Sequence, residues 1–127
     1  MNKVLATALI IVSNVTYAGE YEQYWNAWYQ NKILVEQCSS EKKVTLFLQD
    51  AVANLGNAER TEANAEVIEN VILSNPACFL SSLSALSQDQ CKSVVRFFIR
   101  QPIFHDQEQI EKALKSVKTS GKSCYVS

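Results

Sequence analysis

The sequence contains few residues that interrupt helices and few that build catalytic sites. Its 127 residues include two prolines, three glycines and a single histidine. One histidine cannot share a metal ion or a proton relay with a second one. The sequence also contains no G-x-S-x-G, H-E-x-x-H or glycine-rich phosphate-binding motif. These absences exclude the common hydrolase and nucleotide-binding patterns, so we expect neither an enzyme nor a bound cofactor.

Long apolar runs and clusters of basic residues are also missing. The main apolar stretch, VLATALIIV at 4–12, is far shorter than the roughly 20 residues that a bilayer-spanning helix needs. The net charge is -1, and the longest run of basic residues is Lys42-Lys43. Such a surface is not suited to the phosphate backbone of nucleic acids. We therefore expect no nucleic-acid partner, and no membrane association once the N-terminal segment has been removed.

The first 18 residues have the pattern of a secretory signal peptide. Lys3 provides the positive start, 4–12 is the apolar stretch, and Thr16-Tyr17-Ala18 ends in small residues where signal peptidase cleaves. We expect a signal peptide over 1–18 and one domain over 19–127. The expected destination is the bacterial periplasm.

The rest of the sequence predicts an all-α fold, because its apolar residues recur at helical rather than alternating spacing. We expect a small bundle of about six helices held by disulfides. Thr61, Ser87 with Gln90, and Asp106 are the expected N-terminal caps of the third, fifth and sixth helices, and Pro76 precedes the fourth. The expected ranges are 20–38, 41–55, 61–74, 77–86, 87–101 and 107–118.

All four cysteines, Cys38, Cys78, Cys91 and Cys124, lie in the predicted mature domain. An even number in an exported domain predicts disulfides, and no closely spaced pair suits a structural zinc ion, so we expect no metal. If consecutive helices run antiparallel, Cys38 and Cys78 lie at one end of the bundle and Cys91 and Cys124 at the other. The expected bonds are therefore Cys38–Cys78 and Cys91–Cys124.

Aromatic residues are concentrated at the start of the mature domain. Tyr and Trp are frequent in protein-binding hot spots because they combine a large rigid surface with a polar tip. One buried helix face can take Tyr21, Trp25 and Trp28, which leaves Tyr24 or Tyr29 partly exposed. We therefore include Tyr24 and Tyr29 among the candidate partner-binding residues, although a helix that is simply well packed explains the same pattern.

The turn RQPIFHD at 100–106 is a second candidate for partner binding. Ile103, Phe104 and His105 lie there between two predicted helices and are flanked by charged residues. If Ile103 or Phe104 is exposed, it can serve as a binding contact. The alternative, which we favour from the sequence, is that Phe104 packs into the core and fixes the junction of the helices. A lone histidine at a helix boundary, such as His105, usually bonds to backbone groups.

The C-terminal part of the sequence resembles a known family. The run CKSVVRFFIRQP at 91–102, His105, IEKAL at 110–114 and a closing Cys124 are similar to the pattern of bacterial type VI secretion immunity proteins of the Rap/Tai amidase-immunity type. The resemblance covers about residues 91–124. It implies a small helical periplasmic protein, often a dimer, that blocks the active-site cleft of a peptidoglycan-cleaving effector.

We therefore expect an immunity or inhibitor protein whose partner is a cognate effector toxin, an amidase, and we leave open whether it forms a homodimer. Two alternatives remain. A carrier of small apolar ligands would enclose a cavity lined by residues such as Phe47, Phe79 and Phe98. A periplasmic chaperone or structural protein would expose apolar surface, for which only the N-terminal aromatic residues provide support.

Overall fold

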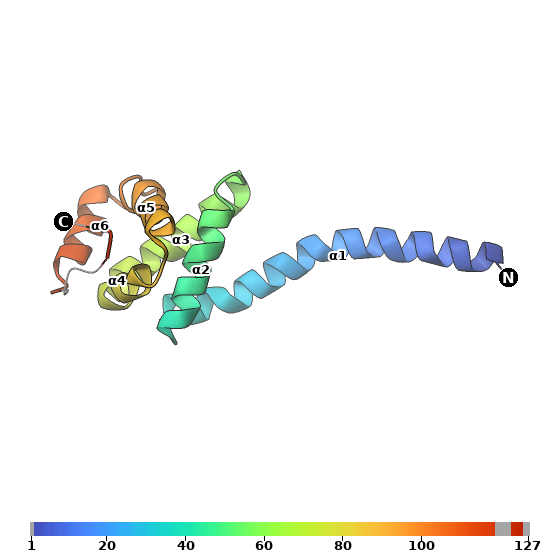
Figure 1. Cartoon of the computed structure of the whole chain (residues 1–127), viewed down its shortest axis with the longest axis horizontal. Helices are drawn as coiled ribbons and strands as arrows, with labels where there is room; N and C mark the ends of the chain where they lie inside the picture. Colours follow the sequence, from blue (N-terminus) through green and yellow to red (C-terminus); the bar gives the residue numbers. More distant parts are fainter. Residues whose placement is uncertain (1, 119–122, 126–127) are drawn as a thin grey trace. The chain divides into compact units, whose positions relative to one another are not determined.

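The structure is a computed structural model that describes residues 2–118 and 123–125, with side chains from residue 19 onward. The described residues form six α-helices and one π-helical turn, and no strand occurs among them (Figure 1). The predicted all-α fold held by disulfides is confirmed. The elements are α1 (Asn2–Glu36), α2 (Glu41–Ala53), α3 (Ala58–Ser74), α4 (Pro76–Ser84), α5 (Gln88–Val94), the π-helical turn η1 (Val95–Ile99) and α6 (Gln107–Lys115).

The chain divides into two compact units, residues 1–31 and residues 32–127. The first contains most of α1, which covers the expected helix over 20–38 as far as Glu36 and extends it towards the N-terminus without a break. The second contains the end of α1 and all the other elements, and the rest of this subsection concerns it. In the part of the chain that the structure describes, no helix has both the length and the apolar character needed to cross a bilayer.

The end of α1 is closed by hydrogen bonds to two of its last carbonyl groups. The Cys38 amide donates to Val35 O at 2.9 Å, and the Ser39 amide donates to Leu34 O at 3.0 Å. This pattern is a Schellman motif, in which the residue after the helix takes a left-handed conformation. Cys38 is that residue, with φ 48°, and it forms the disulfide with Cys78, whose Cα lies 6.6 Å away.

Helices α2 and α4 pack against each other through apolar residues and a few hydrogen bonds. Ser40 caps α2 by accepting a hydrogen bond from the Lys43 amide at 3.1 Å. Val44, Phe47, Leu48 and Ala51 are buried, and their helical spacing places them on one side of α2. Between the helices, the Thr45 hydroxyl donates to Ser82 O at 3.0 Å, and the buried Ser82 hydroxyl donates to Glu41 O at 3.2 Å.

Helix α3 lies at the centre of this unit and packs against α2, α4, η1 and α6 (Figure 1). Its N-terminal cap is Asn57, which accepts a hydrogen bond from the Arg60 amide at 3.1 Å. The prediction that Thr61 caps this helix is wrong. Thr61 lies in the first turn of α3, where its hydroxyl instead donates to Asn54 O at 3.0 Å across the α2–α3 turn.

Helices α4 and α5 begin at the signals that the sequence provides. Pro76 is the first residue of α4, and Asn75 caps it by accepting from the Cys78 amide at 3.1 Å. The predicted capping box of Ser87 and Gln90 is confirmed by both of its hydrogen bonds, each 3.2 Å long.

The sequence did not predict that α5 continues into a π-helical turn. In η1, the amide of Arg100 donates to Val95 O at 3.0 Å, five residues back. Val94, Val95, Phe98 and Ile99 are nevertheless buried, so the predicted apolar face is preserved.

Helix α6 ends at Lys115, three residues earlier than predicted. Asp106 precedes it as expected, although its side chain makes no capping hydrogen bond. Ile110 and Leu114 are buried against the rest of this unit. The second expected disulfide, Cys91–Cys124, is present with its Cα atoms 6.0 Å apart. Residues 119–122 lie outside the described residues.

Candidate functional site

The loop between η1 and α6, residues 100–106, is held in place by a buried carboxylate from α3. Glu69 is 0% exposed, and its two oxygens accept hydrogen bonds from three consecutive backbone amides. The Ile103 amide donates to Oε2 at 2.9 Å and the His105 amide to Oε1 at 2.8 Å. The Phe104 amide lies between them, 3.1 Å from Oε1 and 3.3 Å from Oε2. We refer to Glu69 and these three amides as the Glu69 clamp.

His105 completes the set of groups around this carboxylate. Its Nδ1 lies 3.0 Å from Glu69 Oε1, while its ring is partly exposed. A carboxylate that leaves water without compensating partners is strongly disfavoured, and here four N–H groups or ring nitrogens surround it. Consecutive backbone amides that point to one centre form a concave anion-binding site. In this protein the anion is the chain's own Glu69, so the site is used to fix the loop.

The Glu69 clamp presents two large apolar side chains to solvent. Ile103 is 56% exposed and Phe104 is 45% exposed, although their amides are bound to the buried carboxylate. The expectation that Phe104 packs into the core is therefore wrong. The backbone is pulled inward at these positions by its amides, and the side chains consequently point outward. Ile103, Phe104 and His105 are thus brought together on one fixed loop.

The aromatic residues of α1 belong to the first unit and form a cluster of their own. The rings of Trp25 and Trp28 meet edge to face with centroids 5.3 Å apart, and Trp28 and Tyr29 do so at 5.1 Å. Tyr24 packs on Trp25 in the same manner, at 5.3 Å. Trp28 is buried, as expected, and Tyr29 is exposed, whereas Tyr21, which we expected to be buried, is also exposed.

A basic pocket lies beside η1, in the segment that precedes the loop. It has a volume of about 410 Å³. The pocket is lined by Lys92, Val95, Arg96, Arg100, Gln101 and Cys124. Among the described residues, none of its three cationic side chains lies within ion-pair distance of a carboxylate. The Arg96 guanidinium instead lies over the ring of Phe97, 5.1 Å from its centroid.

Tyr125 reports on the electrostatics near this pocket. Burial is the main cause that raises the pKa of its phenol above the ordinary value of 10.0, and the charge of Glu111 raises it further. Arg100 acts in the opposite direction and lowers it. Arg100, Glu111 and Tyr125 are therefore electrostatic neighbours.

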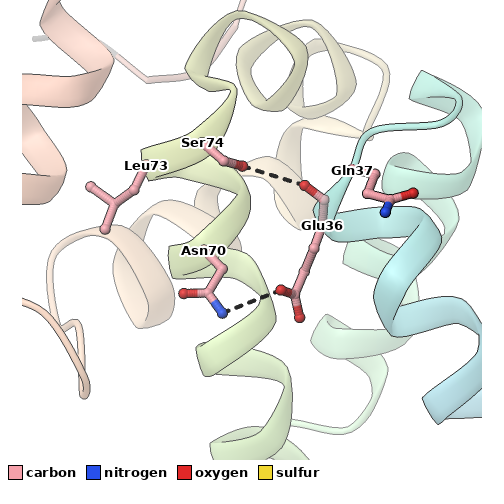
Figure 2. Close-up of a pocket in the computed structure, with 5 residues that line it drawn as sticks. All are labelled: Glu36, Gln37, Asn70, Leu73 and Ser74. Atoms are coloured by element: carbon pink, nitrogen blue, oxygen red, sulfur yellow. Dashed lines mark hydrogen bonds between the residues drawn. The ribbon is translucent and has the colours of Figure 1, made fainter.

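A second pocket, of about 510 Å³, lies between the end of α1 and α3. It is lined by Glu36, Gln37, Asn70, Leu73 and Ser74. In Figure 2, Asn70 and Ser74 reach from α3 towards Glu36. Asn70 Nδ2 donates to Glu36 Oε2 at 3.5 Å, and Ser74 Oγ donates to Glu36 O at 3.3 Å. These polar groups connect the two helices to each other, which is a structural role.

The side chains that we considered as lining for a ligand cavity are part of the core. Phe47, Phe79 and Phe98 are buried, and neither of the two pockets is lined by any of them. Among the described residues, no group of three His, Cys, Asp or Glu side chains has the arrangement of a metal site. The loop and the basic pocket offer exposed apolar groups and cations, respectively, and both kinds of group are suited to binding.

Glu69 was not predicted from the sequence, although a signal was present. Ala65, Ile68, Glu69 and Ile72 follow the i, i+3, i+4, i+7 spacing of a buried helix face, so a carboxylate occurs within an apolar pattern. Such a residue is rarely buried without partners.

Comparison with protein-family models, with curated proteins and with solved structures finds no significant match to this chain.

Proposed function

We propose that the protein is a periplasmic immunity protein, which binds and blocks a secreted cell-wall-degrading amidase. The observation that carries the proposal is the pair Ile103 and Phe104, two exposed apolar side chains on a loop whose backbone is fixed by the Glu69 clamp. An inhibitor of this kind needs a contact that enters a partner's cleft and no catalytic group of its own. The resemblance over residues 91–124 supports the same class.

The rigidity of the loop favours tight binding. Ordering a flexible loop on association costs conformational entropy, about 0.5–1.5 kcal/mol for each immobilised side chain with many rotamers. Here three consecutive amides are already bound to Glu69. The loop therefore keeps its shape before and after binding, and less of the contact energy of Phe104 is lost in ordering it.

The disulfides support an extracytoplasmic location for the proposed function. Disulfides persist in oxidising compartments, and the bacterial periplasm is one of them. The amidase substrate, peptidoglycan, lies in the same compartment. We further propose that the mature chain starts near Gly19 after removal of the signal peptide. N-terminal sequencing of the protein recovered from a periplasmic extract tests this point, and recovery of the intact N-terminus would contradict it.

The experiment for the proposed function is protection from a periplasmic amidase. We expect an amidase to be encoded beside this protein's gene, and that amidase, produced with an export signal in a bacterial host, is the probe. We expect the full-length protein to restore growth and the purified protein to form a stoichiometric complex with the amidase. If neither protection nor a complex is observed with such an amidase, the proposal is wrong.

Variants of the loop test where the contact lies. Replacing both Ile103 and Phe104 by Ala is expected to weaken the complex by about 30-fold or more, since apolar hot-spot side chains contribute about 2 kcal/mol or more in total. Leu46→Ala is the matched control, because Leu46 is 54% exposed on α2 and equally apolar. Equal losses for the loop variant and for Leu46→Ala would contradict this assignment of the contact. Light scattering of the free protein shows in addition whether the unbound form is a dimer.

A further inference from the structure

The basic pocket brings together three cations that have no carboxylate within ion-pair distance among residues 2–118 and 123–125. Lys92, Arg96 and Arg100 all line it, and each of the three side chains is exposed. The chain as a whole has 12 basic and 13 acidic residues, so this concentration of positive charge is a local feature. Cationic side chains are usually dispersed among carboxylates on a surface, and a row of one sign attracts the opposite charge.

The π-helical turn aligns these cations. In a regular α-helix, three residues at intervals of four drift around the axis by about 80° in total, because a turn holds 3.6 residues. The turn from Val95 to Arg100 is closed by a hydrogen bond over five residues, so it holds an additional residue. The wider turn reverses part of this rotation about the helix axis, and Arg100 consequently lines the same pocket as Lys92.

The length of the row selects the kind of ligand. Positions four apart on a helix are separated by about 6 Å, so the three cations extend over about 12 Å. This length, measured along the helix, exceeds that of a single phosphate or carboxylate. Alternate side chains of an extended peptide lie on one face at intervals of about 6.7 Å, which is close to the spacing of the cations.

The surroundings of the row suit carboxylates. Val95, which is buried, and the disulfide-bonded Cys124 provide an apolar floor. Charge interactions are stronger beside such a surface than in bulk water. The guanidinium groups of Arg96 and Arg100 can each bind a carboxylate with two parallel hydrogen bonds.

We propose that the basic pocket binds an extended acidic segment of a protein partner, with carboxylates at alternate positions opposite Lys92, Arg96 and Arg100. This inference rests on the proposed function only in taking the partner to be a protein. Glu111 is the chain's own carboxylate in this electrostatic environment, through its effect together with Arg100 on Tyr125. It does not form an ion pair with Arg100 within the described residues, so the cations remain available.

The test uses the full mature protein and a short fluorescein-labelled peptide with aspartate at every second position. Binding is measured by fluorescence anisotropy. Replacing Lys92, Arg96 and Arg100 together by Gln is expected to lower the affinity by about tenfold or more, since exposed ion pairs contribute about 0.5 kcal/mol or more each. The matched control replaces Lys112, Lys115 and Lys118 by Gln. These substitutions remove the same amount of charge from exposed positions in and after α6. They are expected to change the affinity for the peptide by less than about twofold.

Further arms separate the proposed ligand from other anions. A peptide of the same composition with consecutive aspartates should bind more weakly, because only alternate side chains share one face. The proposal would be overturned by equal affinity for the two peptides or by equal losses of affinity in the two triple variants. Binding of inorganic phosphate or of anionic lipid vesicles in place of the peptide would also overturn it. In the unmodified protein, amide NMR signals of residues 92–101 should shift when the peptide is added, and shifts confined to another region would also overturn it.

This experiment and the amidase experiment can fail independently. If the peptide binds in the basic pocket and no amidase is bound, the immunity function is wrong and the pocket assignment remains. If an amidase is bound with the same affinity by the protein with all three cations replaced, the pocket assignment is wrong and the immunity function remains.

Discussion

Replacing Glu69 by Gln should destabilise the protein and release the loop of residues 100–106. The substitution keeps the shape of the side chain but turns one carboxylate oxygen into an NH2 group. If the remaining oxygen stays at the position of Oε1, it still faces the His105 amide at 2.8 Å. The new NH2 group then meets the Ile103 amide, which is 2.9 Å from Oε2 in the native protein. Two donors face each other there, and the Ile103 amide loses its acceptor.

The expected magnitude follows from these contacts. A buried donor that loses its acceptor costs about 1–3 kcal/mol, and hydrogen bonds to a charged group are stronger than those to a neutral one by about 1 kcal/mol. One lost bond and two or three weakened ones give a loss of at least about 3 kcal/mol. Since domains of this size are stable by about 5–15 kcal/mol, the variant should still fold.

The assay is urea denaturation followed by circular dichroism at a helix band. Tryptophan fluorescence is less suitable, because Trp25 and Trp28 belong to the first unit, whereas the Glu69 clamp belongs to the second. Glu62→Gln is the matched control: Glu62 is an exposed glutamate of the same helix, and we expect a change within about 0.5 kcal/mol. Hydrogen exchange adds a local measurement, in which the amides of residues 103–105 should be protected in the native protein and exchange faster in Glu69→Gln. Equal stability of the two variants, with unchanged exchange of these amides, would refute the reasoning.

Three further predictions concern other parts of the chain. Tyr125 should titrate above pH 10, because its pKa is raised in the folded protein. Its contribution to stability is complete below pH 10 and is lost as the pH rises through the folded-state pKa. The difference in tyrosinate absorbance between the native protein and Tyr125→Phe measures this titration. Cys38 has a φ of 48°, a conformation that glycine adopts more easily than serine. In urea denaturation, the double variant Cys38→Gly with Cys78→Ser should therefore be more stable than Cys38→Ser with Cys78→Ser by about 1 kcal/mol. Equal stability of the two would contradict the left-handed cap. Asn57→Ala should lower the unfolding free energy by about 1 kcal/mol, because it removes the cap of α3. Thr61→Ala should lower it by less, because alanine is the better helix former within α3. If thermal melts gave the reverse order, Thr61 and not Asn57 would be the cap.

Local signals account for the elements that were predicted from the sequence. The apolar spacing in α2, the proline that opens α4 and the capping box of Ser87 each act within a few residues, and the structure contains all three. The disulfide pairing was also predictable, because an antiparallel succession of helices brings Cys38 to Cys78 and Cys91 to Cys124.

The Glu69 clamp was not predictable in the same way. It joins α3 to a loop 34 to 36 residues further along the chain, and nothing in the local sequence of either segment specifies the other. An apolar face with a glutamate in it indicates that a partner exists, but backbone amides as donors have no residue signature. For the same reason Phe104 was expected in the core: its apolar character was visible in the sequence, whereas the anchoring of its backbone was not.

The binding surfaces that we propose depend on departures from regular helix geometry. In a regular continuation of α5, Arg100 would rotate away from Lys92, and the row of cations would be broken. Without Glu69, the amides of the following loop would turn to water, and Ile103 and Phe104 would be free to collapse onto the nearest apolar surface. The irregular segment from Val95 to His105 therefore separates the two kinds of side chain, so that the cations line a pocket and the apolar residues project from a loop. A partner that binds both the basic pocket and the loop would need an acidic strand and an apolar recess. Substitutions of the cations and substitutions of Ile103 and Phe104 affect different contacts, so double-mutant analysis can separate the two contributions to binding.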